Sequence, residues 1–120
     1  MQTQKSGGSI VSISAALVDN PIAGEPASLS MITKGGLNAA TRSLTMEYAK
    51  EHIRFNAVGP GIVATSLHTD NSKEYLESRS PMATVSAVED IASAVVYLTE
   101  ARQITGEVLH VDGGAHVGKW

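Results

Sequence analysis

The chain has 120 residues, a formal net charge of −3 and 42% hydrophobic residues, which fits a single globular unit spanning residues 1–120. The mildly acidic balance argues against a broad nucleic-acid or anionic-membrane surface. There is no cysteine, so disulfides and thiolate zinc sites are excluded, and no apolar run approaches the ~18 residues of a membrane-spanning helix.

The first half of the chain predicts a strand followed by a long helix. Residues 9–14, SIVSIS, are short and β-branched and follow the turn pair Gly7-Gly8, which indicates a strand. Residues 15–27 carry two prolines and a glycine and are typical of a loop. Ser28 is then expected to be the N-cap of a helix that runs to about His52.

The second half predicts two more strands around a second helix. Residues 54–58, RFNAV, indicate a strand, and the polar residues 66–85 indicate a loop with one short helix. Ser86 and Glu89 have the spacing of a capping box, ahead of an apolar stripe at helical spacing. Residues 107–111, EVLHV, predict the third strand.

The resulting order, β-α-β-α-β with nearly continuous apolar strands, favours an α/β fold in which helices cover a parallel sheet, in three layers. Ligands of such sheets bind outside the carboxyl ends of the strands. Three places therefore matter for function: Ser14-Ala15, Pro60-Gly61 and Gly113-Gly114.

Four segments in this order carry a family resemblance: GGSIVSIS, Lys34 early in the long helix, RFNAVGPGIVAT and ITGEVLHVDGG. Together they resemble the C-terminal half of a short-chain dehydrogenase/reductase. The resemblance implies part of a Rossmann-like parallel sheet, incomplete relative to the full family fold, and an enzyme that uses NAD or NADP. The family's glycine-rich phosphate loop lies upstream of the matched segment, and no G-x-G-x-x-G occurs in this sequence.

The resemblance also assigns candidate catalytic residues. The family's Tyr-x-x-x-Lys motif falls on residues 30–34, SMITK, so Ser30 stands at the position of the usual tyrosine. Lys34 is implied to hold the nicotinamide ribose hydroxyls. The family's catalytic serine falls on Ala15, which leaves Ser14, one residue short of it, as a lesser candidate.

A second group of candidates follows the second strand. The resemblance implies that Pro60, Gly61, Val63 and Thr65 line the nicotinamide amide of the cofactor. The alternative is an ordinary strand-ending turn, in which Thr65 could cap a short following helix. The histidines share no ligand spacing, so no metal site is expected, and His110 is expected to be packed or paired.

The serine at position 30 bears on activity. A phenol has a pKa near ~10 that a neighbouring lysine and a charged cofactor can lower, whereas a serine hydroxyl has no comparable acidity and a shorter reach. The resemblance thus implies an oxidoreductase that, in full-length form, uses NAD or NADP to act on small carbonyls or alcohols, with its activity impaired in this chain. The alternative is a non-catalytic, partner-forming or oligomer-forming fragment, a pseudoenzyme.

Two further expectations concern the long helix and the cell compartment. Small residues on this helix, Ala39, Ala40 and Ser43, and a bare sheet edge predict a homo-oligomer. Gly35-Gly36 are expected to let the helix lie close to the cofactor or the sheet. Without a targeting signal in the sequence, we expect a cytoplasmic protein.

Overall fold

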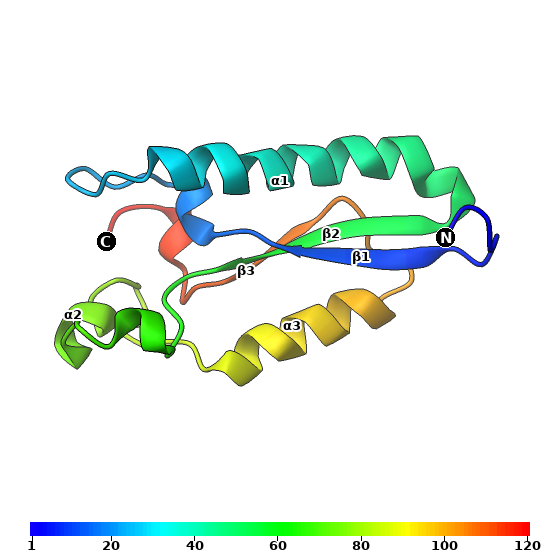
Figure 1. Cartoon of the computed structure of the whole chain (residues 1–120). Coiled ribbons are helices and arrows are strands. Elements are labelled where there is room, and N and C mark those ends of the chain that lie inside the picture. Colours follow the sequence, from blue (N-terminus) through cyan, green and yellow to red (C-terminus); the bar gives the residue numbers. More distant parts are fainter.

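The computed structural model describes all residues 1–120 and shows a sheet between two helical layers (Figure 1). The strands are β1 (Gly8–Ile13), β2 (Ile53–Pro60) and β3 (Val108–Val111), and the helices are α1 (Ser28–Tyr48), α2 (Lys73–Glu77) and α3 (Val88–Glu100). Short 3₁₀ turns complete the chain: η1 (Ala16–Val18), η2 (Ala49–Glu51), η3 (Ser66–His68) and η4 (Ala115–Val117).

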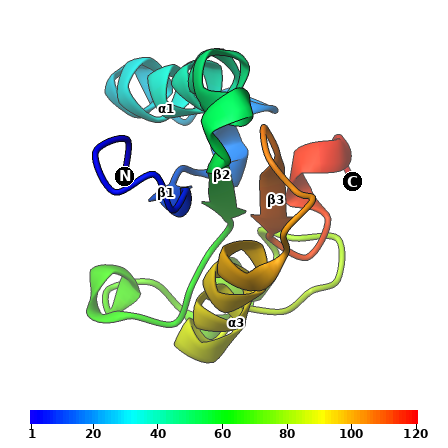
Figure 2. The same cartoon turned by 90° about the vertical axis from the view of Figure 1, so that its right-hand side faces the viewer.

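The sheet is parallel, with the strand order β1-β2-β3. Its register pairs Gly8 with Ile53 and Ala57 with Val108, and α1 and α3 cover opposite faces (Figure 2). This confirms the predicted three-layer α/β fold and the order β-α-β-α-β. Because the strands are parallel, their carboxyl ends meet at one edge of the sheet.

The apolar core lies between the sheet and α3. Val58, Ala94 and Leu98 are buried together there. Six partly buried apolar side chains surround them: Val11, Ile91, Val95, Ile104, Leu109 and Val111. Successive residues of a strand point to opposite faces of the sheet, so the even-numbered residues of β2 point toward α3.

Two polar side chains of β2 complete the α3 face. Arg54 donates to the carbonyl oxygens of Leu98 and Thr99 at 2.7 and 2.6 Å, near the C-terminal end of α3. The buried amide of Asn56 donates to Ile104 O and accepts from Glu107 N at 2.9 and 3.1 Å. The carbonyls left unpaired at a helix end are thereby satisfied.

The layer formed by α1 is more polar on its inner side. Its two fully buried residues are Asn38 and Thr41, and the Oδ1 atom of Asn38 has no hydrogen-bond partner. Its outer side instead exposes large apolar residues: Leu29, Ile32 and Met46 are 76, 73 and 84% exposed. Packing within this chain therefore leaves these apolar side chains of α1 exposed to solvent.

Both predicted helix starts need a correction of one residue. Ala27, not Ser28, is the N-cap of α1, and no side chain caps that end. At α3 the N-cap is Ala87, whose N–H donates to Asp90 Oδ2 at 2.7 Å, so Asp90 takes the role assigned to Glu89. Ala87 has no side-chain oxygen, and only one half of a capping box forms. β2 is also longer than the predicted 54–58, because pairing continues through Pro60.

None of the helices is both long enough and apolar enough to cross a membrane.

Candidate functional site

The candidate residues gather where the carboxyl ends of the strands meet the first turns of α1. Lys34 Nζ donates to the carbonyl oxygen of Ile13, the last residue of β1, at 2.9 Å. Ser14 lies directly after this strand, is buried, and donates from Oγ to Lys34 O at 3.2 Å. The end of β1 and the helix are thus joined by two hydrogen bonds, one in each direction.

These bonds affect what each side chain can still do. An ammonium group has three donors, and only one of those of Lys34 is used within the chain, so the other two can meet acceptors such as ribose hydroxyls. The Ser14 proton is already given to the helix carbonyl. Ser14 is therefore suited to holding the strand against the helix more than to donating a proton to a substrate.

Ser30 lies one helical turn before Lys34 on the same side of α1, because residues four apart on a helix are neighbours. It is exposed, and its hydroxyl forms no hydrogen bond within the chain. The structure places Ser30, Lys34 and Ser14 in one region. It offers no second group that positions or activates the Ser30 hydroxyl.

The segment after β2 is held tightly. Gly61 N donates to Val111 O at 3.0 Å, and a Cβ atom at Gly61 would come within 2.9 Å of Asp112 Cα. Only glycine permits this approach of two strand ends. Val63 then pairs with Ser86 in an isolated parallel bridge, which fixes the course of the chain toward Thr65.

Thr65 precedes η3, as the capping alternative expected, but its hydroxyl caps no backbone N–H. The rim, as we call the four residues Pro60, Gly61, Val63 and Thr65, therefore begins at the last residue of β2 and continues past it. The side chain of Thr65 remains free for a ligand.

The glycine pair on α1 does not behave as expected. A Cβ atom at Gly35 would make only an ordinary contact, 3.6 Å from Val18 Cγ1 of η1. Gly36 faces open space, with nothing within 4 Å. Close approach of α1 to the sheet is therefore not the reason for these glycines, and close approach to a cofactor stays a prediction.

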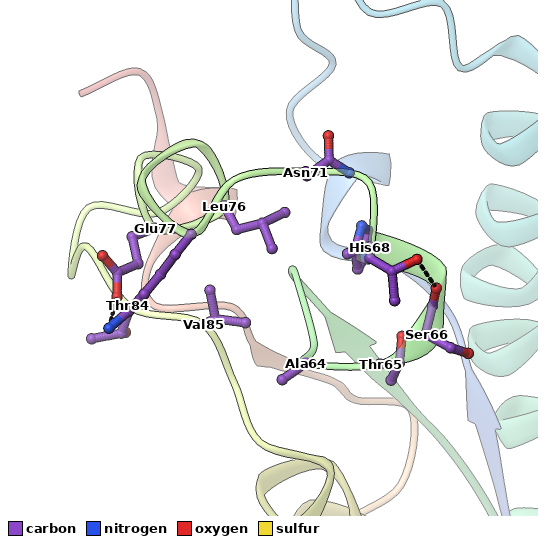
Figure 3. A pocket seen from close by; sticks show the side chains of 11 residues that line it. Ala64, Thr65, Ser66, His68, Asn71, Leu76, Glu77, Thr84 and Val85 are labelled. Carbon is purple, nitrogen blue, oxygen red and sulfur yellow. Dashed lines mark hydrogen bonds and ion pairs between the residues drawn. The ribbon is translucent and has the colours of Figure 1, made fainter.

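A cavity of about 750 Å³ opens beside Thr65, between η3, α2 and the strand-like segment before α3 (Figure 3). Its walls come from residues 64–77 and from Thr84 and Val85. Figure 3 shows Leu76 and Val85 directed into the space. This cavity lies in the region that the sequence marked only as a loop with a short helix.

Two sets of contacts hold this region, and the sequence did not reveal either. Glu25, in the loop before α1, pairs with Arg79 at 2.6 Å and accepts a hydrogen bond from the Tyr75 hydroxyl at 3.4 Å. The ring of Trp120 donates to Ser78 O at 3.1 Å. Both sets join residues at least 42 positions apart, and no local pattern signals such contacts.

The histidines also pair in ways that spacing did not suggest. His110 contacts Asp19 at 2.5 Å, which confirms that His110 is paired, and its ring stacks on that of His116 at 3.7 Å between centroids. Asp112 is buried and accepts from the backbone N–H groups of Gly114 and His116. These contacts tie η1 to η4 behind the site. No group of three or more His, Asp or Glu side chains is arranged to hold a metal ion.

The parallel sheet covered by helices defines the class, a Rossmann-like α/β protein, and the candidate residues lie at the carboxyl ends of its strands, where ligands of such sheets bind. Comparison with known proteins then gives the family. The family described as enoyl-(acyl carrier protein) reductase matches residues 1–116. The chain belongs to the short-chain dehydrogenase/reductase family, as the motifs predicted.

Individual relatives agree with this assignment. The chain is 39% identical over 111 residues to 3-oxoacyl-[acyl-carrier-protein] reductase from Homo sapiens, covering 92% of this chain and 46% of the relative. It is 35% identical over 124 residues to L-rhamnose 1-dehydrogenase (NAD(P)(+)) from Sphingomonas sp. (strain SKA58), covering 98% and 48%. The chain thus spans about half the length of these curated relatives.

A solved structure gives the same picture in three dimensions. The chain superimposes on 4-hydroxyisoleucine dehydrogenase complexed with NADH with a TM-score of 0.81 and 32% sequence identity. The match covers 98% of this chain and 50% of that one. The Rossmann-like α/β fold is therefore confirmed, and the family-level class is that of oxidoreductases acting on alcohol or carbonyl groups.

Proposed function

We propose that this chain forms the substrate and nicotinamide side of an NAD- or NADP-dependent oxidoreductase that interconverts small carbonyls and alcohols. The observation that carries the proposal is the placement of Lys34, whose ammonium lies at the carboxyl end of β1 with two donors to spare. The similarity to 4-hydroxyisoleucine dehydrogenase complexed with NADH and to L-rhamnose 1-dehydrogenase (NAD(P)(+)) supports this choice of cofactor. The cytoplasmic location expected from the sequence belongs to the same proposal.

The cofactor, when bound, supplies or accepts a hydride. Lys34 would hold its ribose hydroxyls, and the rim of Pro60, Gly61, Val63 and Thr65 would border its nicotinamide amide. The donor set fits, because Lys34 offers free N–H groups and Thr65 a free hydroxyl. Ser14 orients Lys34 through the helix carbonyl that its hydroxyl contacts.

Ser30 limits the chemistry of this site. A positioned proton donor contributes roughly 10²–10⁴-fold to such reactions, and a serine hydroxyl with no activating partner is a poor donor. We infer that this chain supports slow proton transfer at best. Replacing Ser30 by tyrosine in a full-length context should raise kcat; an unchanged kcat would show that another group donates the proton.

Calorimetric titration with NADH and with NADPH tests the cofactor part of the proposal. We expect weak binding to the purified chain, and we expect Lys34→Met to abolish it. Lys50→Met is the matched control, since Lys50 lies in η2 at the far end of α1. No heat of binding at millimolar concentrations of either nucleotide would refute autonomous oxidoreductase function.

The second candidate is a non-catalytic chain whose role is to associate with partners. It is favoured by the exposed apolar outer side of α1, which carries Leu29, Ile32 and Met46. Burying one such side chain is worth about 1.5–3 kcal/mol, so a second copy packed there would be stabilised. Light scattering tests this: we expect a homo-oligomer that Ile32→Glu dissociates. A monomer at all concentrations would contradict it.

A further inference from the structure

Four side chains near the carboxyl ends of β1 and β3 form one connected cluster: Asp19, His110, Asp112 and His116. The Asp19 carboxylate meets Nε2 of His110 at 2.5 Å, and the His110 ring stacks on the His116 ring, 9° from parallel. His116 Nδ1 in turn lies 2.9 Å from Asp112 Oδ2. An ionised carboxylate only accepts hydrogen bonds, so these two ring nitrogens are the donors. The cluster joins η1 to η4, which lie next to each other in Figure 1 as the blue and red turns.

One end of this cluster reaches the lysine of the proposed cofactor site. Asp19 is the C-cap residue of η1, the turn that follows Ser14. The turn lies against α1 beside Lys34, because a Cβ atom at Gly35 would come 3.6 Å from Val18 Cγ1. The hydrogen bond from Ser14 Oγ to Lys34 O joins the same two segments. The position of η1 therefore contributes to the position of Lys34.

The other end of the cluster reaches the rim. Asp112 lies directly behind Gly61, since a Cβ atom at Gly61 would come within 2.9 Å of Asp112 Cα. The Asp112 side chain is 2% exposed and is held by the backbone N–H and the ring of His116. His110 touches the same side, because a Cβ atom at Gly59 would lie 3.2 Å from its Cδ2 atom. Gly59 directly precedes the rim, so both aspartate–histidine pairs contact the segment that carries it.

We propose that Asp19 is a positioning residue for the nicotinamide site: through the stacked histidines it fixes Lys34 relative to the rim. The inference rests on the proposed function, in which Lys34 and the rim hold the same cofactor. Lys34 and the four rim residues share no hydrogen bond of their own. A ligand held at two places binds best when their spacing is set before it arrives, because less ordering is then needed on binding. The cluster provides such a connection behind the site.

The NADH affinity of the folded chain tests this role. Asp19→Ala removes the contact with His110 and should weaken NADH binding about three- to ten-fold, the effect of losing one hydrogen bond that orders a site. Asp19→Asn removes the same charge but keeps an oxygen that accepts from His110 Nε2, so the affinity should stay within about two-fold of that of the unmodified chain. Glu100→Ala is the matched control, since it removes one exposed carboxylate at the C-terminal end of α3. An unchanged affinity in Asp19→Ala, or an equal loss in Asp19→Asn, would overturn the proposal.

Amide spectra without nucleotide separate positioning from a general effect on stability. Each variant is expected to shift the signal at the opposite end of the cluster. In ¹⁵N-labelled Asp19→Ala the Gly61 signal should shift, and in His110→Phe, which keeps a ring against His116, the Lys34 signal should shift. Either variant serves if the other does not fold. If both variants only lower the free energy of unfolding, with these two signals and the NADH affinity unchanged, the cluster is structural and the proposal is wrong.

This inference and the proposed function fail separately. If NADH does not bind the unmodified chain, the cofactor proposal fails, and the nucleotide-free spectra alone decide whether the cluster fixes Lys34 relative to the rim. If NADH binds and neither Asp19→Ala nor His110→Phe changes its affinity, the cofactor site stands and the positioning role of Asp19 fails.

Discussion

The two faces of the sheet are packed differently, and the candidate residues Ser30 and Lys34 lie on the helix that covers the more polar face. On the α3 face, apolar side chains fill the interface and each polar group of β2 has its partner. On the α1 face, the buried residues of the helix are polar, Asn38 lacks a partner for its Oδ1 atom, and large apolar residues point outward. The α3 interface is filled within this chain apart from Ser9 Oγ of β1, which lacks a partner. α3 also exposes Val88, Val96 and Tyr97. The helix α1 differs in carrying Ser30 and Lys34 of the candidate site and in burying polar residues.

The largest loss of stability should come from removing the Arg54 side chain, which joins β2 to the end of α3. Arg54→Met removes the donor to the carbonyls of Leu98 and Thr99, and hydrogen bonds from charged groups are worth about 1.5–3 kcal/mol. We expect the free energy of unfolding, measured by urea denaturation, to fall by about 2–3 kcal/mol. Arg102→Met is the control, because Arg102 forms no hydrogen bond or ion pair. Equal losses of unfolding free energy in the two variants would show that the hydrogen bonds of Arg54 do not stabilise the fold.

A pair of buried asparagines compares the two faces directly. Asn56→Ala leaves Glu107 N unpaired and leaves Ile104 O with only its 3.4 Å contact to Arg54, and should cost about 2 kcal/mol of unfolding free energy. Asn38→Leu removes an amide that is already unpaired and should leave the stability equal or raise it by about 1 kcal/mol. Both values come from the same denaturation series. A loss at Asn38 as large as that at Asn56 would show that the Asn38 amide stabilises the fold as much as the hydrogen-bonded amide of Asn56 does.

A pair of glycines makes the next comparison. Gly61→Ala places a methyl group against the backbone of Asp112, and overpacking of this kind costs about 1–3 kcal/mol. Gly36→Ala meets nothing within 4 Å and should stabilise α1 by about 0.5–1 kcal/mol. Thermal unfolding should therefore shift in opposite directions for the two variants. A stabilised Gly61→Ala would mean that the strand ends are more loosely held than described.

The smallest expected effect concerns the contacts around the cavity. Glu25→Gln weakens a half-exposed ion pair with Arg79, which is worth about 0.2–1 kcal/mol. Hydrogen exchange of α2 should quicken about two- to five-fold, with little change in global stability. Trp120 is the only tryptophan, so its fluorescence reports the contact with Ser78. Glu100→Gln, on α3, should change neither signal.

Local residue patterns predict most of the secondary structure of this chain. The apolar strands, the long helix and the parallel order followed from residues 9–14, 54–58 and 107–111, and the structure confirms them. Helix starts were placed one residue too late for α1 and too early for α3. The reason is that Ala27 and Ala87 serve as N-caps without the polar side chain that marks most helix starts.

Contacts between distant segments were the part that could not be predicted. Glu25 and Arg79 are charged residues in loops, and nothing in their neighbourhood indicates that they meet. Asp19 and His110 are 91 positions apart. The cavity beside Thr65 likewise arises from how residues 64–77 and Thr84–Val85 come together, and the polar sequence there predicts only a loop with a short helix.

The most direct test of the central claim is a titration of the ¹⁵N-labelled chain with NADH, followed residue by residue. The account predicts amide shifts at Ser14, Lys34, Gly61, Val63 and Thr65, and none on α3. Lys34→Met should remove these shifts without changing the rest of the spectrum. Shifts confined to α3, or a spectrum unchanged at millimolar NADH, would contradict the assignment of the nicotinamide site to Lys34 and the carboxyl ends of β1 and β2.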